Sequence, residues 1–165
     1  MKIIPYDRAA AVAYARRWAL DRNLAYADFS QMGGDCTNFI SQALFAGGGA
    51  MNETRDRGWY FHSLSRRAPA WTAVPHLYEF LTKNQGRGPF GHEASLDEAE
   101  PGDVIQLKFA DSKDYSHSLL VLETGKRPAP ENILIAAHSL DSLNRPLNTY
   151  SYVQARLIKI DGVRM

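Results

Sequence analysis

The single cysteine of the chain, Cys36, lies among residues that suit nucleophilic catalysis. Two glycines and Asp35, a good N-cap, precede it, and apolar residues at helical spacing follow as far as Ala46, before Gly47. The unpaired N–H groups of a helix N-terminus favour a thiolate and can hold an oxyanion. This pattern predicts a thiol nucleophile in the first turn of a helix. The alternative is a small, inert buried residue.

A cysteine nucleophile needs a base, and His117 is the histidine best placed to supply one. Residues 115–123 alternate like a strand, which puts His117, Leu119 and Val121 on one face, predicted to face the core. A histidine at the start of that face can reach a helix N-terminus packed there and accept the proton of Cys36. The alternative is a structural histidine with one satisfied hydrogen bond.

A third polar group must orient the imidazole, and three residues compete for this role. His138 leads, because it ends the next predicted strand, and a hairpin would place it beside His117. Asp141 is the alternative, since a carboxylate orients an imidazole well. Asn144 is weaker, because it lies among ordinary turn residues.

The elements that would position these residues predict an α+β fold, with N-terminal helices packed on an antiparallel sheet. Besides the cysteine helix, helices are expected from Asp7 to about Asn23 and over residues 71–83. Strands are expected over residues 104–109, 115–123, 133–138 and 150–160. Residues 51–67 and 84–93 show no sustained period and are expected to form loops.

Polar and aromatic side chains near Cys36 are candidates for the rest of the site. Tyr26 and Gln31 are close enough in sequence to frame the cysteine. Trp59 and Tyr60 lie in the expected loop over residues 51–67, where they would either wall a cleft or cover the edge of the core.

The composition favours a single domain over residues 1–165 that acts on a small partner. A chain of 165 residues can bury a core without disulfides. Nineteen Lys and Arg against 18 Asp and Glu give no strong field, so neither nucleic acid nor a membrane surface is expected as a partner. No zinc-ligand spacing appears, and neither a metal nor a cofactor is expected. The oligomeric state is left open.

Taken together, the motifs resemble those of the bacterial putative amidase domain family, a branch of the papain-like cell-wall amidases and endopeptidases. The match runs in order from Tyr6 to Ile160. Its parts are an opening Tyr-Asp-Arg-Ala-Ala-Ala-Val-Ala-Tyr-Ala helix, Gly-Gly-Asp-Cys-Thr-Asn-Phe-Ile-Ser-Gln, Gly-Gly, Trp-Tyr, Pro-Gly-Asp-Val-Ile, His-Ser and a late His. The segment around the cysteine is the most specific.

The resemblance implies a papain-like cysteine hydrolase. Cys36 would be the nucleophile, His117 the general base and then acid, and His138 the third member, with Asp141 still open. An oxyanion donor upstream of the nucleophile would be Gln31, Tyr26 or the backbone N–H of Cys36, and Asp35 belongs to the same segment.

The implied substrate is a peptidoglycan stem peptide or a similar small peptide amide, cleaved through a thioester acyl-enzyme. Family members often occur on exported proteins, which implies an extracellular or cell-wall location, although Met1–Asp7 carries no apolar segment of signal-peptide length. Two other functions remain open, a thiol acyltransferase that uses the same pair and a binding module in which Cys36 is idle.

Overall fold

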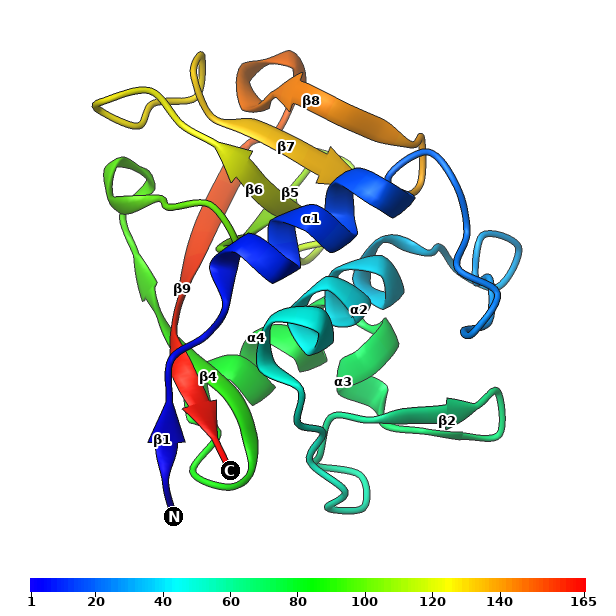
Figure 1. Ribbon diagram of the computed structural model, residues 1–165. Coiled ribbons are helices and arrows are strands. Elements are labelled where there is room, and N and C mark those ends of the chain that lie inside the picture. The colour runs from blue at the N-terminus through cyan, green and yellow to red at the C-terminus, as the bar shows by residue number, and fades with distance from the viewer.

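A seven-stranded sheet in which all neighbouring strands are antiparallel carries the fold, and the helices pack mainly on one of its faces (Figure 1). The computed structural model describes all 165 residues. The helices are α1 (Arg8–Trp18), α2 (Cys36–Gly48), α3 (Pro69–Thr72) and α4 (Val74–Lys83), with short 3-10 turns at Leu96–Glu98 and Leu147–Thr149. The predicted α+β class and antiparallel sheet are confirmed. No helix is both long enough and apolar enough to cross a membrane.

The order of strands in the sheet is β1-β9-β5-β6-β7-β8, and β4 pairs with β9 as well. The strands are β1 (Ile3–Ile4), β4 (Gly88–Ala94), β5 (Val104–Lys108), β6 (His117–Glu123), β7 (Leu134–Ala137), β8 (Ser142–Pro146) and β9 (Gln154–Arg164). A separate hairpin, β2 (Phe61–Ser63) with β3 (Arg66–Arg67), projects from the helical side (Figure 1).

Helices α1 and α2 begin at the predicted residues, and they pack closely. Helix α2 continues through Gly47 and Gly48, beyond its expected end at Ala46. The Asp7 carboxylate accepts a hydrogen bond from the backbone N–H of Ala10 at 2.9 Å, while Gly49, in the left-handed conformation (φ 68°), ends α2. Helix α1 ends at Trp18, earlier than the expected end near Asn23. A Cβ on Gly47 of α2 would lie 2.5 Å from the ring of Tyr6, so glycine at this position permits the residues just before α1 to approach α2 closely.

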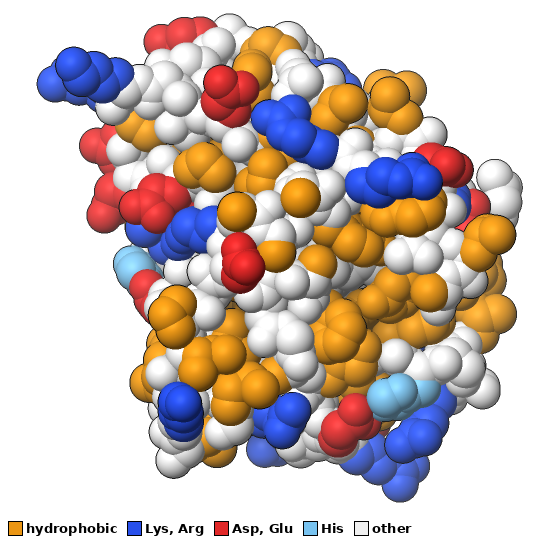
Figure 2. Space-filling model, in the orientation of Figure 1, with side chains coloured by type: hydrophobic (Ala, Val, Ile, Leu, Met, Phe, Trp, Pro, Cys, Tyr) orange, Lys and Arg blue, Asp and Glu red, His pale blue; other side chains and the backbone are white.

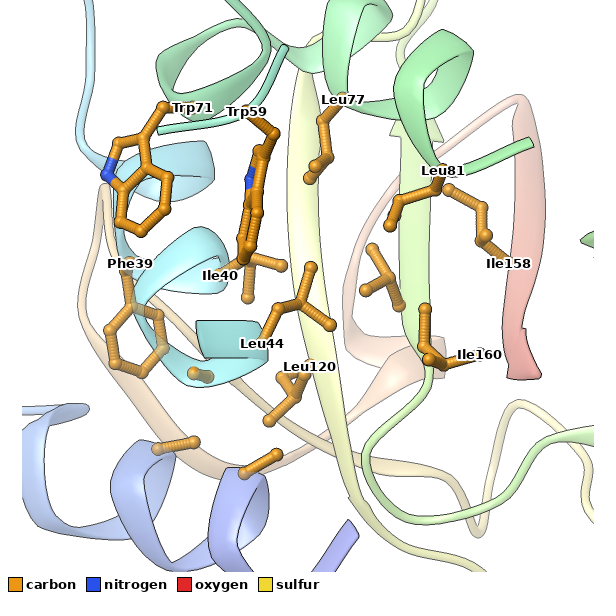
Figure 3. Close-up of a cluster of buried hydrophobic side chains, with 14 of the residues drawn as sticks. Phe39, Ile40, Leu44, Trp59, Trp71, Leu77, Leu81, Leu120, Ile158 and Ile160 are labelled. Carbon is orange, nitrogen blue, oxygen red and sulfur yellow. The ribbon is translucent and has the colours of Figure 1, made fainter. Parts of the chain in front are cut away.

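Strand β6 is buried on both faces, and this decides where each of its side chains lies. Leu120 and Leu122 pack with the helices in the larger core, which Figure 3 shows between α2, α4 and β9. Leu119 and Val121 pack in a second core on the opposite face of the sheet. Apolar side chains of β6 therefore lie on both faces of the sheet, and only the packing shows which face the helices cover.

Three segments differ from the predicted elements. Most of the expected loop over residues 84–93 forms β4, which pairs with β9 and has a register shift at Phe90 and Gly91, where Asp161 of β9 is passed over. Residues 142–146, expected as a turn, form the edge strand β8. The expected loop over residues 51–67 contains the β2–β3 hairpin.

Candidate active site

Cys36 is the first residue of α2, as predicted, but its sulfur is nearly covered. The side chain is 8% exposed. Its sulfur lies 3.7 Å from the hydroxyl of Thr37, and the backbone N–H groups of Thr37 and Ser118 also face it. Burial raises the pKa of the thiol more than these hydrogen bonds lower it. The expected thiolate is therefore not the resting form, because desolvation outweighs the helix N-terminus.

His117 is the first residue of β6, and its backbone lies close to the sulfur of Cys36. The N–H that faces the sulfur belongs to Ser118, in the peptide group that joins His117 to Ser118. Its ring, however, points to the other face of the sheet, where ring centroids of Phe109 and Tyr150 lie 6.5 and 5.6 Å away. The prediction that the imidazole shares a face with α2 is wrong, because α2 packs on the face of Ser118 and Leu120.

The surroundings of His117 keep it neutral. Burial, and after it the positive charge of Arg145, lower the pKa of His117 to about 4. A neutral imidazole can accept a proton, as a base must. No hydrogen bond joins it to Cys36 in this structure, where Thr37 is the hydrogen-bond partner of the sulfur.

His138, the expected orienting residue, has other partners. Strands β6 and β7 pair as predicted, with Leu120 opposite Ala136, and this register places His138 one residue out of step with His117 and on the opposite face. Nδ1–H of His138 donates to Asp35 at 2.5 Å, and Nε2 lies 2.8 Å from the Trp18 carbonyl oxygen and 3.2 Å from Nη1 of Arg22. Both ring nitrogens therefore have partners away from His117. His138 does not orient His117.

The other two candidates for the third role are also bonded elsewhere. Asp141 makes a bidentate ion pair with Arg22, at 2.9 and 3.0 Å. The amide oxygen of Asn144 accepts a hydrogen bond from Arg16 at 2.8 Å. Neither side chain therefore serves the imidazole of His117 in this structure.

Asp35 occupies the N-cap position of α2, yet its carboxylate does not cap the helix. It accepts hydrogen bonds from the backbone N–H of Phe29 at 2.8 Å and from the side chain of Asn38 at 2.9 Å, and it receives the Nδ1–H of His138. Arg22 lies 3.5 Å away. Asp35 thus ties the loop before α2, the end of β7 and the end of α1 to the residue that precedes Cys36.

The polar residues of the cysteine segment are buried and hydrogen-bonded to the scaffold. Each lies on α2, and each meets a partner from another element. The pairs are Thr37 with Ser118 (3.0 Å), Asn38 with the indole of Trp71 (3.0 Å), Ser41 with the indole of Trp59 (3.0 Å) and Gln42 with Tyr14 (2.5 Å). The segment is therefore a buried polar network that fixes the position of α2.

The expected cleft residues are distributed differently. Trp59 is fully buried, so it belongs to the core and does not wall a cleft (Figure 3). Tyr26 stacks on Trp71, with ring centroids 5.9 Å apart, and Tyr60 stacks on His62 at 5.5 Å. Gln31 is exposed in the turn before the two glycines. None of these four makes a hydrogen bond to the sulfur.

A pocket of about 510 Å³ is lined by residues that do not include Cys36. Its lining runs from Asn52 to Gly58 and along α4, beyond the C-terminal end of α2. No group of three or more His, Cys, Asp or Glu side chains is arranged to hold a metal ion. On the face shown in Figure 2, cationic and anionic side chains are interspersed around an apolar area.

Two residues that the sequence analysis did not single out lie beside His117. The hydroxyl of Tyr150 is buried and has no hydrogen-bond partner. The guanidinium of Arg145 lies over the Tyr150 ring, 3.6 Å from its centroid. No motif marks either residue, since Tyr150 begins a predicted strand and Arg145 lies in a predicted turn.

Comparison with known proteins places the site in context. The sequence matches the family described as "Putative amidase domain" over residues 5–160. It is 34% identical over 142 residues to the uncharacterized protein YhbB of Bacillus subtilis, covering 85% of this chain and 43% of that protein. It is 28% identical over 149 residues to the uncharacterized protein YjcM of the same organism, covering 86% of this chain and 32% of that protein. The chain spans less than half the length of these curated relatives. No solved structure matches the sequence.

Proposed function

Because the chain belongs to the putative amidase domain family, we propose that it hydrolyses amide bonds with Cys36 as nucleophile and His117 as base. The observation that carries the proposal is the position of Cys36. The single cysteine begins α2, and backbone N–H groups from two elements face its sulfur. Such N–H groups stabilise negative charge on the sulfur as it loses its proton.

In this mechanism, His117 accepts the proton of the Cys36 thiol while the sulfur attacks the carbonyl carbon of the amide. The C–N bond breaks, the leaving amine takes the proton from the imidazolium, and a thioester remains on Cys36. Water then attacks the thioester, which releases the acid and restores the thiol. The ring of His117 turns toward the sulfur in the substrate complex, since catalytic hydrogen bonds often form only when substrate is bound.

The proposed substrates are peptidoglycan-type or other small peptide amides, and the proposed scaffold is papain-like. A cysteine at a helix N-terminus and a histidine at the start of an antiparallel strand, as found here, support the scaffold assignment. The substrate class rests on the motif resemblance described for the sequence. An acyltransferase would use the same residues and differ only in passing the acyl group to an amine.

The burial of Cys36 favours a second candidate, a binding module in which the thiol is idle. A cysteine residue that is 8% exposed and whose thiol has a raised pKa is typical of an inert structural cysteine. Cys36 does not line the pocket of about 510 Å³ between residues 52–58 and α4.

The hydrolase and the idle binding module are separated by incubating the protein with digested peptidoglycan and measuring new free amines. Repeating the incubation with an added amine acceptor separates the hydrolase from the acyltransferase. The hydrolase releases amine, and the Cys36→Ala and His117→Ala variants lose this activity while keeping the wild-type circular dichroism spectrum. The matched control is His76→Ala, since His76 is exposed on α4. Equal amine release by wild type and Cys36→Ala contradicts the cysteine mechanism. A new amide in place of the acid identifies the transferase.

A further inference from the structure

The hydroxyl of Tyr150 stands apart among the polar side chains of the protein. It is the one buried side-chain oxygen or nitrogen that has no hydrogen-bond partner. A buried, unpaired hydroxyl is unfavourable, so native proteins keep few of them, often where a catalytic role or an unfilled partner explains them. The position of Tyr150 therefore matters.

Tyr150 lies against the candidate base. Its ring centroid is 5.6 Å from that of His117, and the two rings meet at 57°. The guanidinium of Arg145 covers the Tyr150 ring at 3.6 Å, and Arg145 is itself held by hydrogen bonds to the hydroxyl and the carbonyl oxygen of Thr149, at 2.7 and 3.3 Å. The tyrosine is thus clamped between a cation and the imidazole.

His117 in turn lacks a partner for its ring. A neutral imidazole carries one N–H and one free lone pair, and its tautomer is set by whichever group accepts that N–H. The one charge that acts on the pKa of His117 is the cation Arg145, and the three residues expected to orient the ring, His138, Asp141 and Asn144, are bonded elsewhere. An unpaired hydroxyl and an unpaired imidazole therefore lie side by side.

We propose that Tyr150 is the positioning residue of His117, whose ring N–H its hydroxyl oxygen accepts, leaving the other ring nitrogen free to take the proton of Cys36. This proposal rests on the proposed function. Forming the bond requires the two rings, now 5.6 Å apart at 57°, to change their relative orientation, and it gives the buried hydroxyl its missing partner. A neutral acceptor suits this position, since Arg145 already sets a positive charge next to both rings.

The test compares Tyr150→Phe, which removes only the hydroxyl, with Tyr152→Phe as the matched control. Tyr152 also borders the second core and is half-buried. The first readout is the tautomer of His117, from two-bond ¹H–¹⁵N NMR spectra in which His117→Gln assigns the signals. The second is kcat and KM for the amide substrate.

The proposal predicts one dominant tautomer in wild type and Tyr152→Phe, and a mixture in Tyr150→Phe. It also predicts that Tyr150→Phe lowers kcat by roughly tenfold or more with KM within about twofold, since general base catalysis contributes about 10²–10⁴ and depends on ring orientation. The same tautomer ratio in Tyr150→Phe as in wild type overturns the proposal, whatever the turnover. The tautomer measurement needs no substrate, so loss of the proposed function itself is recognised separately, by hydrolysis that does not depend on Cys36.

Discussion

Cys36 and His117 are both held in their uncharged forms, and burial is the main reason for each. Burial raises the pKa of the thiol and lowers that of the imidazole to about 4. The two groups thus favour a neutral pair over a thiolate and an imidazolium. A neutral pair transfers its proton during the reaction and not before it.

The pKa of His117 predicts a pH dependence of stability. In the unfolded chain an ordinary histidine binds a proton below about pH 6.5, whereas folded His117 does so only below about pH 4. The unfolded state therefore binds more protons between these values, and stability falls as the pH falls through this window, by up to about 3 kcal/mol. Urea unfolding of wild type and His117→Gln between pH 7 and pH 4 measures this loss as the difference between the two proteins.

His76→Gln is the control for this experiment, because His76 is exposed on α4. It is expected to follow the wild-type pH dependence. If His117→Gln also follows it, His117 is not held neutral by its surroundings.

The raised pKa of Cys36 predicts slow alkylation. Only the thiolate reacts, so iodoacetamide should label the folded protein at pH 7 more slowly than free cysteine, with a rate that rises above pH 9. Mass spectrometry of the labelled protein against pH gives the profile. Fast labelling that is already constant below pH 7 would show a thiolate–imidazolium pair and contradict the neutral resting state.

At the scale of elements, the start of α2 is fixed by a buried hydrogen-bonded carboxylate. Asp35 and its partner His138 have side chains that are 1% and 2% exposed. A buried carboxylate is unfavourable alone, and here it accepts the Nδ1–H of His138 and lies 3.5 Å from the Arg22 guanidinium. Nε2 of His138 contacts both the Trp18 carbonyl oxygen and Arg22, which links the same cluster to the end of α1.

Replacing Asp35 by Asn should therefore destabilise the protein by about 3–5 kcal/mol, because it removes the charge of a buried carboxylate that accepts three hydrogen bonds and faces the Arg22 guanidinium at 3.5 Å. Urea unfolding at pH 7 measures the change. Asp28→Asn is the matched control, since Asp28 also faces Arg22 but is exposed, and a change below about 1 kcal/mol is expected there. Equal effects of the two substitutions would show that the buried carboxylate contributes nothing special.

The close contact at Gly47 gives a second prediction at this scale. Alanine there would bring a Cβ within 2.5 Å of Tyr6 and 2.8 Å of the Asp7 carbonyl, so the start of α1 must shift. Gly47→Ala is expected to lower the free energy of unfolding by about 1–3 kcal/mol, as overpacking does. Thermal unfolding tests this, and an unchanged or raised Tm would contradict it.

The helices could be predicted from the sequence because their boundaries are local. Asp7 caps α1 and Gly49 ends α2 through contacts within a few residues. The face of β6 could not be predicted, because Leu119 and Leu120 are both fully buried and periodicity cannot say which of them meets the helices. Strand β4 was missed because Gly88 and Gly91 resemble loop residues until β9 lies alongside them.

The candidate site shows the same limit. Cys36 could be placed at the helix start from its neighbours in sequence, and the β6–β7 hairpin from the alternation of its strands. The partners of His138 and Asp141 could not be predicted, since Trp18 and Arg22 come from a segment more than 100 residues earlier. Tyr150 was missed for the same reason, because its importance lies in what surrounds its hydroxyl.

At the scale of the whole molecule, the sheet joins the two ends of the chain, since β1 pairs with β9 (Figure 1). Strand β9 also pairs with β4 and β5, so it links β1 and β4 to the rest of the sheet. Organisation as one domain over residues 1–165 stays a prediction. The relatives YhbB and YjcM are more than twice as long as the stretches matched here. Their substrates have to be measured on the full-length relatives themselves.

The most direct test of the proposed function is to look for the acyl group on the sulfur. The whole chain is mixed with peptidoglycan peptides, quenched in acid within seconds and digested, and the Cys36 peptide is weighed by mass spectrometry. The mechanism predicts a hydroxylamine-labile acyl adduct on Cys36 that decays as free amine and acid accumulate, and its absence in His117→Ala. Amide hydrolysis at the wild-type rate by Cys36→Ala, with no adduct on Cys36 in wild type, would contradict it.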